Sequence, residues 1–221
     1  MSAREHPGLR VVNVFCAGDG TGGNPLGVFL GGTAVPESER QPIARELGFS
    51  ETVFVDDAER GVMRIFTPEE ELALAGHPLV GTAWLLREAG MEVEVLRPPA
   101  GEVPVRFEGE MTYATARPEW SPPWEFTRLD SPADVDVLAA APDGRERVFW
   151  AWLDEAAGIV RARAFALDAG VPEDEATGSA ALMLTAQLGR EIEIRQGEGS
   201  LIHARPLEDG RAEIAGLVVA A

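Results

Sequence analysis

Two segments of the sequence place an acid–base side chain at the same spacing from a glycine. His77 lies four residues before Gly81 in GHPLVGTAWLL, and Asp174 lies four residues before Gly178 in EDEATGSAALM. In both segments Gly-[Thr/Ser]-Ala opens an apolar helix that ends in glycine, so the two segments form an internal repeat. A histidine and an aspartate at such positions could transfer protons or orient polar groups of a ligand, but each could equally be an ordinary N-terminal helix cap.

The repeated segments predict two buried helices, over about residues 78–89 and 177–188. Both are apolar nearly all round and carry few charges before the last turn, which is typical of helices inside a protein. Free N–H groups and the positive end of the dipole at a helix N-terminus attract anions. If the two halves face each other, the helix starts at Gly81 and Gly178 would hold a carboxylate, with the two acid–base residues on opposite walls of the cleft.

The rest of the pattern indicates an α/β (α+β) protein made of two similar lobes. Each lobe is expected to be a curved, mostly antiparallel sheet or barrel wrapped around one central helix, with the active-site cleft between the lobes. We predict an N-terminal lobe over residues 9–116 and a C-terminal lobe over 117–221, whose last strand could pack back on the first lobe. The proline-rich segment 117–147 is interpreted as an irregular connection with room for a strand at 134–138. A further helix is expected over 37–47.

The composition excludes several classes of protein. The 221 residues include 19 basic and 37 acidic side chains, a net charge of -18 that repels phosphate backbones and anionic lipids, so we expect no nucleic-acid and no membrane partner. Every basic residue is arginine, which rules out lysine Schiff bases, lysine-anchored pyridoxal phosphate and P-loops. Three histidines and one cysteine leave too little for a His-rich or Cys-rich metal site. With no apolar leader and no membrane-length apolar run, the chain is predicted to be soluble and cytoplasmic.

Five motifs span most of the chain. They are VVNVFCAGDGTGGNPLGVFL (11–30), IARELGFSETVFV (43–55), RIFTPEEELALAGHPLVGTAWLL (64–86), RARAFALDAGVPEDEATGSAALM (161–183) and RQG (195–197). In these motifs and in their order the sequence resembles the PhzF group, the phenazine-biosynthesis isomerases and their relatives. The resemblance implies a two-lobed fold shared with diaminopimelate epimerase, a cofactor-free active site in the cleft, a small-molecule carboxylate substrate and, commonly, a homodimer.

The resemblance also implies roles for individual residues. By position in the motifs, Glu51 is the general acid/base, and His77 and Asp174 are its partners in the cleft. The residues at the two helix starts and in the adjoining motifs would bind the substrate, and neither a metal nor a cofactor is expected. The substrate-binding set is Asn24, Ser50, Gly76, Gly81, Thr82, Gly178 and Ser179.

The sequence departs from the family pattern at three places. Glu175 stands where the family usually has proline, and Gly199-Ser200 replaces a longer Gly-Arg-Pro-Ser type of element. The chain is also short for the family, with the deficit around 117–147. These changes shorten the contribution of the second lobe to the cleft, so the motifs identify the site without identifying its substrate.

The surroundings of Glu51 suggest what the site does. Glu51 lies between Phe49 and the apolar pair Val53 and Phe54, and burial of a carboxylate raises its pKa. A raised pKa lets one group take a proton from carbon and return it elsewhere near neutral pH. We therefore expect a cofactor-independent isomerase that moves a proton within a small carboxylate-bearing metabolite. Isomerisation of a phenazine precursor is one activity of this kind.

Two alternatives stay open. The chain could be a non-catalytic member of the same fold that binds a small anion, or a racemase or epimerase in which Glu51 is opposed by His77 or Asp174. Epimerisation by two facing cysteines is excluded, because Cys16 is the only cysteine and lies within the first predicted strand, where a small buried hydrophobe is expected.

Overall fold

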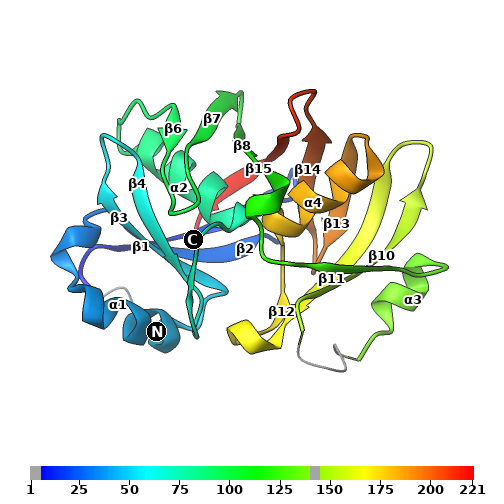
Figure 1. The fold of residues 1–221 in the computed structure, drawn as a ribbon, viewed down its shortest axis with the longest axis horizontal. Coiled ribbons are helices and arrows are strands. Elements are labelled where there is room, and N and C mark those ends of the chain that lie inside the picture. Colours follow the sequence, from blue (N-terminus) through cyan, green and yellow to red (C-terminus); the bar gives the residue numbers. More distant parts are fainter. Residues whose placement is uncertain (1–5, 140–144) are drawn as a thin grey trace.

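Two helices that contact each other occupy the interior of the protein (Figure 1). The computed structural model describes residues 6–139 and 145–221. Helix α2 spans Gly76–Glu88 and helix α4 spans Gly178–Leu188, and most of their residues are buried. Both helices predicted from the apolar repeat are therefore present. Gly189 ends α4 in the left-handed conformation, with φ of 65°, as expected for a glycine stop.

A large, curved sheet packs around the two helices, and this mixed α/β architecture is the one the sequence predicts (Figure 1). The strands that precede the middle of the chain are β1 (Leu9–Cys16), β2 (Asn24–Phe29), β3 (Glu51–Asp57), β4 (Val62–Phe66), β5 (Glu71–Leu72), β6 (Val95–Leu96), β7 (Val103–Glu108) and β8 (Met111–Ala116). The later strands are β9 (Glu125–Arg128), β10 (Arg147–Asp154), β11 (Ile159–Ala166), β12 (Val171–Asp174), β13 (Ile192–Gln196), β14 (Ser200–Pro206) and β15 (Ala212–Ala220).

The strands follow the order β5-β4-β3-β2-β1-β15-β14-β13-β11-β10-β9, with the remaining strands attached at the side of this path. Most neighbouring strands are antiparallel, and the pairs β2–β3, β9–β10 and β11–β13 are parallel. Strands β1–β4, β7 and β8 lie around α2, and β10, β11, β13 and β14 lie around α4 (Figure 1). Each helix thus buries its apolar surface against its own set of strands, and all but a few of the largest buried side chains belong to one continuous core.

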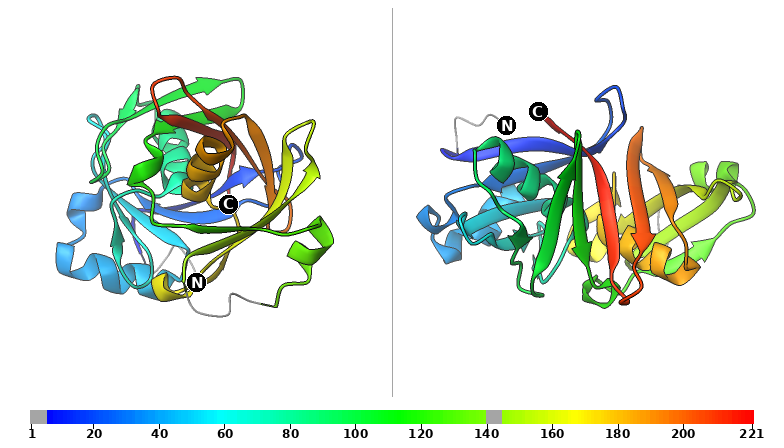
Figure 2. Two further views of the ribbon diagram at one scale, coloured as in Figure 1. Left: turned by 45° about the vertical axis from the view of Figure 1, so that its right-hand side comes forward. Right: turned by 90° about the horizontal axis from the view of Figure 1, so that it is seen from above.

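Strand β15 connects the two sets of strands. Its first part pairs with β14, its second part pairs with β1, and its other edge pairs with β8. Figure 2 shows this strand in red between β8 and β14 in the view from above. Gly216 lies where the partner changes, and a Cβ atom there would collide with the buried ring of Phe15. Strand β15 pairs with β1 and β8, which precede residue 117, and with β14, which follows it. The division into two lobes after residue 116 therefore stays a prediction.

The segment 117–147 contains more regular structure than its prolines indicated. It holds a short 3-10 helix (Pro118–Trp120), strand β9 and helix α3 (Pro132–Asp136). The strand expected at 134–138 is wrong, because Ser131 caps a helix by accepting the backbone N–H of Asp134 at 3.3 Å, and Pro132 occupies its first position. The end of the segment, at 140–144, lies outside the described residues.

The remaining helices lie outside the two central ones. Helix α1 spans Glu37–Leu47, the range predicted from its glycine stop. Two further 3-10 helices span Gly32–Ala34 and Leu167–Ala169. Among the described residues, every helix is too short or too polar to cross a lipid bilayer.

Candidate active site

The first residues of α2 and α4 lie against each other, backbone to backbone. A Cβ atom on Gly76 would collide with the backbone of Gly178, and a Cβ atom on Gly178 would lie 2.8 Å from the Cα of Gly76. Glycine is therefore required at both positions by the close approach of the two helices. The contact brings the free N–H groups and the positive dipole ends of both helices to one place, where an anion would be stabilised.

The two acid–base residues of the repeat are not helix caps. The N-cap positions are Ala75 and Thr177, and neither helix start has a side-chain cap. His77 is the second residue of α2, whereas Asp174 ends strand β12, four residues before α4. Ordinary capping is therefore wrong as an explanation for either residue.

Gly81 and Thr82 lie farther along α2 than the repeat predicts. Because the helix begins at Gly76, the predicted helix start at Gly81 is wrong, and both residues belong to the second turn. A Cβ atom on Gly81 would lie 2.6 Å from the side chain of Leu26 and 2.7 Å from that of Val14. This glycine therefore permits α2 to pack on strands β1 and β2, and the free N–H groups belong to the residues that follow Ala75.

Glu51, His77 and Asp174 form a buried cluster. They come from β3, α2 and β12, and one ligand atom of each lies within 4.8 Å of the other two. Nδ1 of His77 is 3.2 Å from Oε2 of Glu51. The exposed fraction is 1% for His77, 6% for Asp174 and 9% for Glu51. Three groups able to exchange protons are thus held together away from bulk water.

Asn24, the first residue of β2, connects this cluster to the start of α4. Its side-chain amide donates to Oδ1 of Asp174 at 2.6 Å and to the carbonyl of Ala176 at 3.2 Å. Nδ1 of His77 lies 3.4 Å from the same amide nitrogen, so the two amide protons of Asn24 face three neighbouring groups. Thr177 Oγ1 donates to the second oxygen of Asp174 at 2.6 Å. Both oxygens of Asp174 are therefore held as acceptors, which favours the ionised form.

The three groups have different pKa shifts because their surroundings differ. Burial raises the pKa of Glu51 well above its ordinary value, and the negative charge of Asp174 raises it further. Burial lowers the pKa of His77 to about 3, so the imidazole is neutral. Burial also raises the pKa of Asp174, but hydrogen bonds from three neighbouring side chains oppose that shift. Asp174 is therefore the carboxylate of the cluster, and Glu51 is the carboxyl group that readily holds a proton.

Two polar atoms of the cluster are buried without a hydrogen-bond partner in the described part of the chain. They are Oε2 of Glu51, which lies 3.2 Å from Nδ1 of His77, and Nε2 of His77. Buried polar atoms without a partner are suited to contact a bound substrate.

A narrow pocket lies beside the cluster. Its volume of about 20 Å³ has room for a water molecule and not for a metabolite. The wall is formed by β3, β12, the start of α4 and the segment before β9. The lining residues are Ser50, Glu51, Thr67, Leu72, Pro122, Trp124, Glu146, Ala166, Ala169, Val171, Asp174 and Ser179.

Most residues assigned to the site from the sequence meet at this point. Ser50, Glu51, Asp174 and Ser179 line the pocket. His77 and Asn24 contact the cluster directly, and the first glycines of the two helices touch beside it. Gly81 and Thr82 are the two that the structure places elsewhere, in the second turn of α2.

Some residues that shape the site were not identified from the sequence. Trp124 donates from Nε1 to Oγ of Ser179 at 3.0 Å, and Ser121 donates to the carbonyl of Ser179 at 3.1 Å. Gln196 donates to the carbonyl of Asp174 at 2.7 Å. Gln196 belongs to the RQG motif, which could have marked it as a site residue. Trp124 lies in the segment interpreted as an irregular connection, where no motif marked it.

The same cluster could hold a metal ion, because it offers one nitrogen and two oxygen donors at suitable distances. A metal would require Glu51 in its ionised form, whereas burial raises the pKa of Glu51 and favours the protonated form. The donor set therefore fits proton transfer better than metal binding, and the absence of a metal stays a prediction.

Comparison with known proteins identifies the family. The family model of PhzC-PhzF, described as phenazine biosynthesis-like protein, matches residues 12–146, more than half of the chain. The trans-2,3-dihydro-3-hydroxyanthranilate isomerase of Pseudomonas chlororaphis is 31% identical in an alignment of 86% of this chain with 87% of that protein. The chain belongs to the PhzC-PhzF family.

Two other relatives of this PhzC-PhzF family member extend the comparison. An uncharacterized isomerase of Pasteurella multocida is 44% identical over 35% of this chain, and the alignment spans only 28% of that protein. The crystal structure of a putative phenazine biosynthesis PhzC/PhzF protein from Clostridium difficile superimposes with a TM-score of 0.76 and 21% identity, covering 96% of both chains. At that identity the likeness concerns the fold, which is the fold that the motifs implied. No comparison supports a non-catalytic binding protein.

Proposed function

We propose that this PhzC-PhzF family member is a cofactor-independent isomerase that moves a proton within a small carboxylate-bearing metabolite. The observation that carries the proposal is the position of Glu51. Its carboxyl group is buried, lies 3.2 Å from a neutral imidazole, and is next to a carboxylate that raises its pKa. A carboxyl group with a raised pKa can both accept and return a proton near neutral pH.

The proton transfer leaves the overall oxidation state of the substrate unchanged. Ionised Glu51 takes a proton from a carbon next to a double bond, and the electron pair of that C–H bond forms a new double bond. The old double bond opens toward its far carbon, to which Glu51 returns the proton. The imidazole of His77 and the carboxylate of Asp174 orient polar substituents during the transfer.

The substrate carboxylate is proposed to bind at the paired starts of α2 and α4. No basic side chain lines the pocket in the described part of the protein, so the backbone N–H groups that follow Ala75 and Thr177 are the available donors. Ser179 Oγ already accepts a hydrogen bond from Trp124 and keeps its own proton for a ligand. These donors explain how an acidic protein without lysine can bind an anion.

Substrate entry requires the pocket to widen, because its present volume of about 20 Å³ does not hold a metabolite. The two helix starts belong to separate sets of strands, so a small rotation of one set relative to the other would open the site. Closure would then exclude water from Glu51 during the transfer.

The activity named for the Pseudomonas chlororaphis relative suggests the first substrate to test. The protein would be incubated in heavy water with trans-2,3-dihydro-3-hydroxyanthranilate, and deuterium in the product would be located by NMR. We expect deuterium at the carbon that receives the proton, with the rate reduced by a factor of about 10² to 10⁴ in Glu51→Gln.

Glu110→Gln is the matched control, because Glu110 is an exposed glutamate in the turn between β7 and β8. Unchanged turnover in Glu51→Gln would refute the proposed role of Glu51. Binding of the compound with no deuterium incorporation would favour a binding protein, and incorporation with inversion of configuration at one carbon would favour an epimerase.

We also propose that the protein acts in the cytoplasm as a homodimer. The proposal is supported by its acidic charge, by its single cysteine, and by the assembly that the family resemblance implies. Light scattering of the purified protein and fractionation of cells that express it test the two parts separately.

A further inference from the structure

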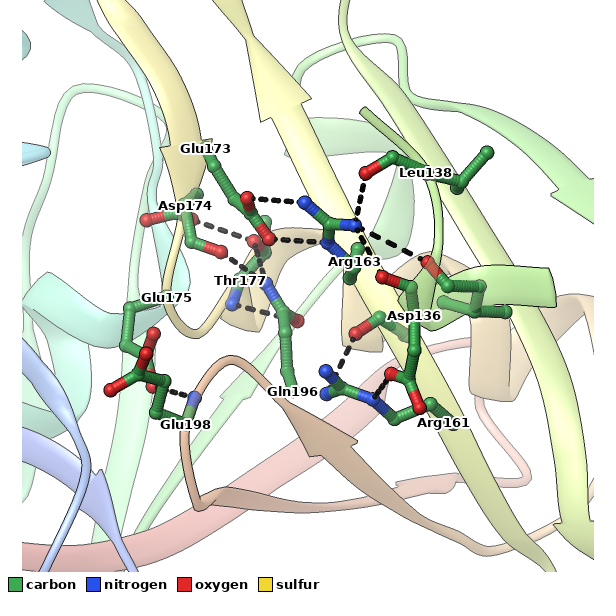
Figure 3. A network of polar contacts seen from close by, with 12 residues as sticks. Asp136, Leu138, Arg161, Arg163, Glu173, Asp174, Glu175, Thr177, Gln196 and Glu198 are labelled. Atoms are coloured by element: carbon green, nitrogen blue, oxygen red, sulfur yellow. Dashed lines mark hydrogen bonds and ion pairs between the residues drawn. The ribbon is translucent and has the colours of Figure 1, made fainter. Parts of the chain in front are cut away.

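Glu175 follows Asp174 in the sequence and directs its side chain to the turn between β13 and β14 (Figure 3). One carboxylate oxygen, Oε1, accepts the backbone N–H of Glu198 at 2.8 Å and the hydroxyl of Ser200 at 2.9 Å. Gly197 in this turn makes room for the contact, because a Cβ atom there would collide with the Glu175 carboxyl group. The turn is therefore shaped around this one side chain.

Ser200 extends the contact to the loop between β1 and β2. Its hydroxyl oxygen accepts the backbone N–H of Gly23 at 3.0 Å. The preceding residue, Gly22, packs on the same turn, since a Cβ atom on Gly22 would lie 2.8 Å from the carbonyl carbon of Gly199. The turn thus holds the backbone immediately before Asn24.

Asn24 closes a ring of contacts, because its amide donates to Asp174 at 2.6 Å. The ring runs from Asp174 along the chain to Glu175, then by hydrogen bonds to Ser200 and Gly23, along the chain to Asn24, and back to Asp174. Ser200 is 0% exposed and Asn24 is 1% exposed, so water does not readily replace these bonds. A displacement of the turn would therefore be passed on to the Asn24 amide.

A second clamp holds the same stretch of backbone from the side of β13. Gln196 donates to the carbonyl of Asp174 at 2.7 Å and to Oγ1 of Thr177 at 2.8 Å (Figure 3). This clamp fixes the backbone before α4, and its hydrogen bonds go to Asp174 and Thr177. The Glu175 contact adds a second coupling between the segment of Asp174 and the loop before Asn24, beside the direct hydrogen bonds from Asn24 to Asp174 and Ala176.

We propose that Glu175 is a positioning residue of the active site. Through the ring of hydrogen bonds it fixes Asn24, and through Asn24 it fixes the carboxylate of Asp174. The effect on rate rests on the proposed function, whereas the effect on geometry rests on the hydrogen bonds alone. Two departures from the family pattern, Glu175 and the short Gly199-Ser200 element, meet in this ring.

The test compares Glu175→Ala, which removes the acceptor, with Glu175→Gln, whose amide oxygen can accept the same two bonds without the charge. In Glu175→Ala we expect exchange of the Gly23 amide proton to speed up at least about 10-fold and the side-chain amide NMR signal of Asn24 to shift. In the deuterium assay we expect kcat to fall about 10-fold or more, with KM little changed. Glu175→Gln should restore all three observations toward the wild type.

Ser200→Ala is the second variant, and it interrupts the same ring without altering a charge. It should reproduce the Gly23 and Asn24 effects, and the double variant should add no further loss of rate because one path is broken twice. It also supplies the test if Glu175→Ala does not fold.

Wild-type exchange at Gly23 together with an unshifted Asn24 signal in both alanine variants would overturn the proposal. So would a Glu175→Gln variant as impaired as Glu175→Ala, because the charge and not the positioning would then be responsible. A wild-type protein that transfers no deuterium would refute the proposed function instead, and the Gly23 and Asn24 signals would still decide the role of Glu175.

Discussion

The starts of α2 and α4 carry the same sequence pattern and yet hold their acid–base residues in different ways. His77 lies inside the first turn of its helix, whereas Asp174 lies on a strand before its helix begins. Both oxygens of Asp174 accept short hydrogen bonds, whereas Nε2 of His77 has no partner among the described residues. One half of the repeat therefore fixes a charged group, and the other half leaves a nitrogen of a neutral imidazole free for a ligand.

The difference shows that a repeated scaffold need not give a symmetric site. The two glycines at the helix starts are equivalent, because each is required by the other. The side chains around them are not equivalent, since the two shorter hydrogen bonds of the Asn24 amide go to the second half, to Asp174 and Ala176. Burial lowers the pKa of His77 and raises that of Asp174, because it disfavours the charged form of each group, and only the shift of Asp174 is opposed by hydrogen bonds.

The largest loss of stability is expected when one of the two glycines at the helix starts is replaced. Gly76→Ala should lower the free energy of unfolding by about 3 kcal/mol or more, because the new Cβ would collide with the backbone of Gly178 and not with the end of a side chain. Gly81→Ala should cost less, about 2 kcal/mol, since its new Cβ meets buried methyl groups of Leu26 and Val14 instead of backbone, and alanine favours the helix. Urea unfolding measures both values, and equal losses would contradict the distinction.

The unequal bonding of the two acid–base residues predicts unequal losses of stability. Asp174→Asn keeps one acceptor oxygen and places an NH2 group opposite the Asn24 amide or the Thr177 hydroxyl, so we expect a loss of about 2 kcal/mol. His77→Gln should cost about 1 kcal/mol, because the imidazole makes fewer hydrogen bonds. Thermal unfolding with both variants provides the comparison, and a larger loss for His77→Gln would reverse the assignment of the fixed and the free group.

The opposite pKa shifts predict opposite slopes of stability against pH. Between about 3 and 6.5 the unfolded state binds the His77 proton and the folded state does not, so this group makes stability rise with pH. Above about 4.5 the folded state keeps the Glu51 proton that the unfolded state has lost, so that group makes stability fall with pH. The two slopes cancel in part between pH 4.5 and 6.5.

Replacement of either Glu51 or His77 should leave only the pH dependence of stability that the other residue causes. In Glu51→Gln we expect stability to rise by up to about 1.4 kcal/mol per pH unit more steeply than in the wild type over pH 4.5 to 6.5. In His77→Gln the change should have the opposite sign. Urea unfolding at several pH values measures the slopes, and parallel curves for all three proteins would contradict these protonation states.

The smallest effect is expected from removal of metal ions. Because the buried Glu51 carboxyl group favours its protonated form, we expect a chelator to leave deuterium transfer unchanged. Loss of the activity on chelation, with recovery on addition of a divalent cation, would assign the three clustered side chains as metal ligands.

The sequence predicted what depends on local pattern. Glycine stops gave the ends of α1, α2 and α4 within about two residues, because glycine in the left-handed conformation ends helices at Gly48 and Gly189. The short helix α3 was missed because a serine cap and a proline start it in a segment otherwise typical of loops. Local rules carry enough information for long elements and too little for a five-residue helix.

Contacts between distant segments could not be predicted in this way. Glu51, His77 and Asp174 were chosen from motifs, but nothing in the sequence shows that Asn24 bonds to Asp174 or that Trp124 bonds to Ser179. Such contacts depend on how the strands assemble around the two helices. The exact start of α2 was also wrong, because its tight packing on α4 extends the helix back to Gly76.

The position of β15 has a consequence for how the protein reaches its native state. This strand joins β1, β8 and β14, and it aligns Ala220 with Val12 across nearly the whole chain. During synthesis β15 emerges last of these strands, so the edges of β1 and β8 that pair with it stay unpaired until then. Pairing between strands so far apart in the sequence is slow, and unpaired strand edges can associate with other chains. The sheet is therefore completed by one late event, the pairing of β15. Before that event, chaperones would have to protect the open edges of β1 and β8 from other chains.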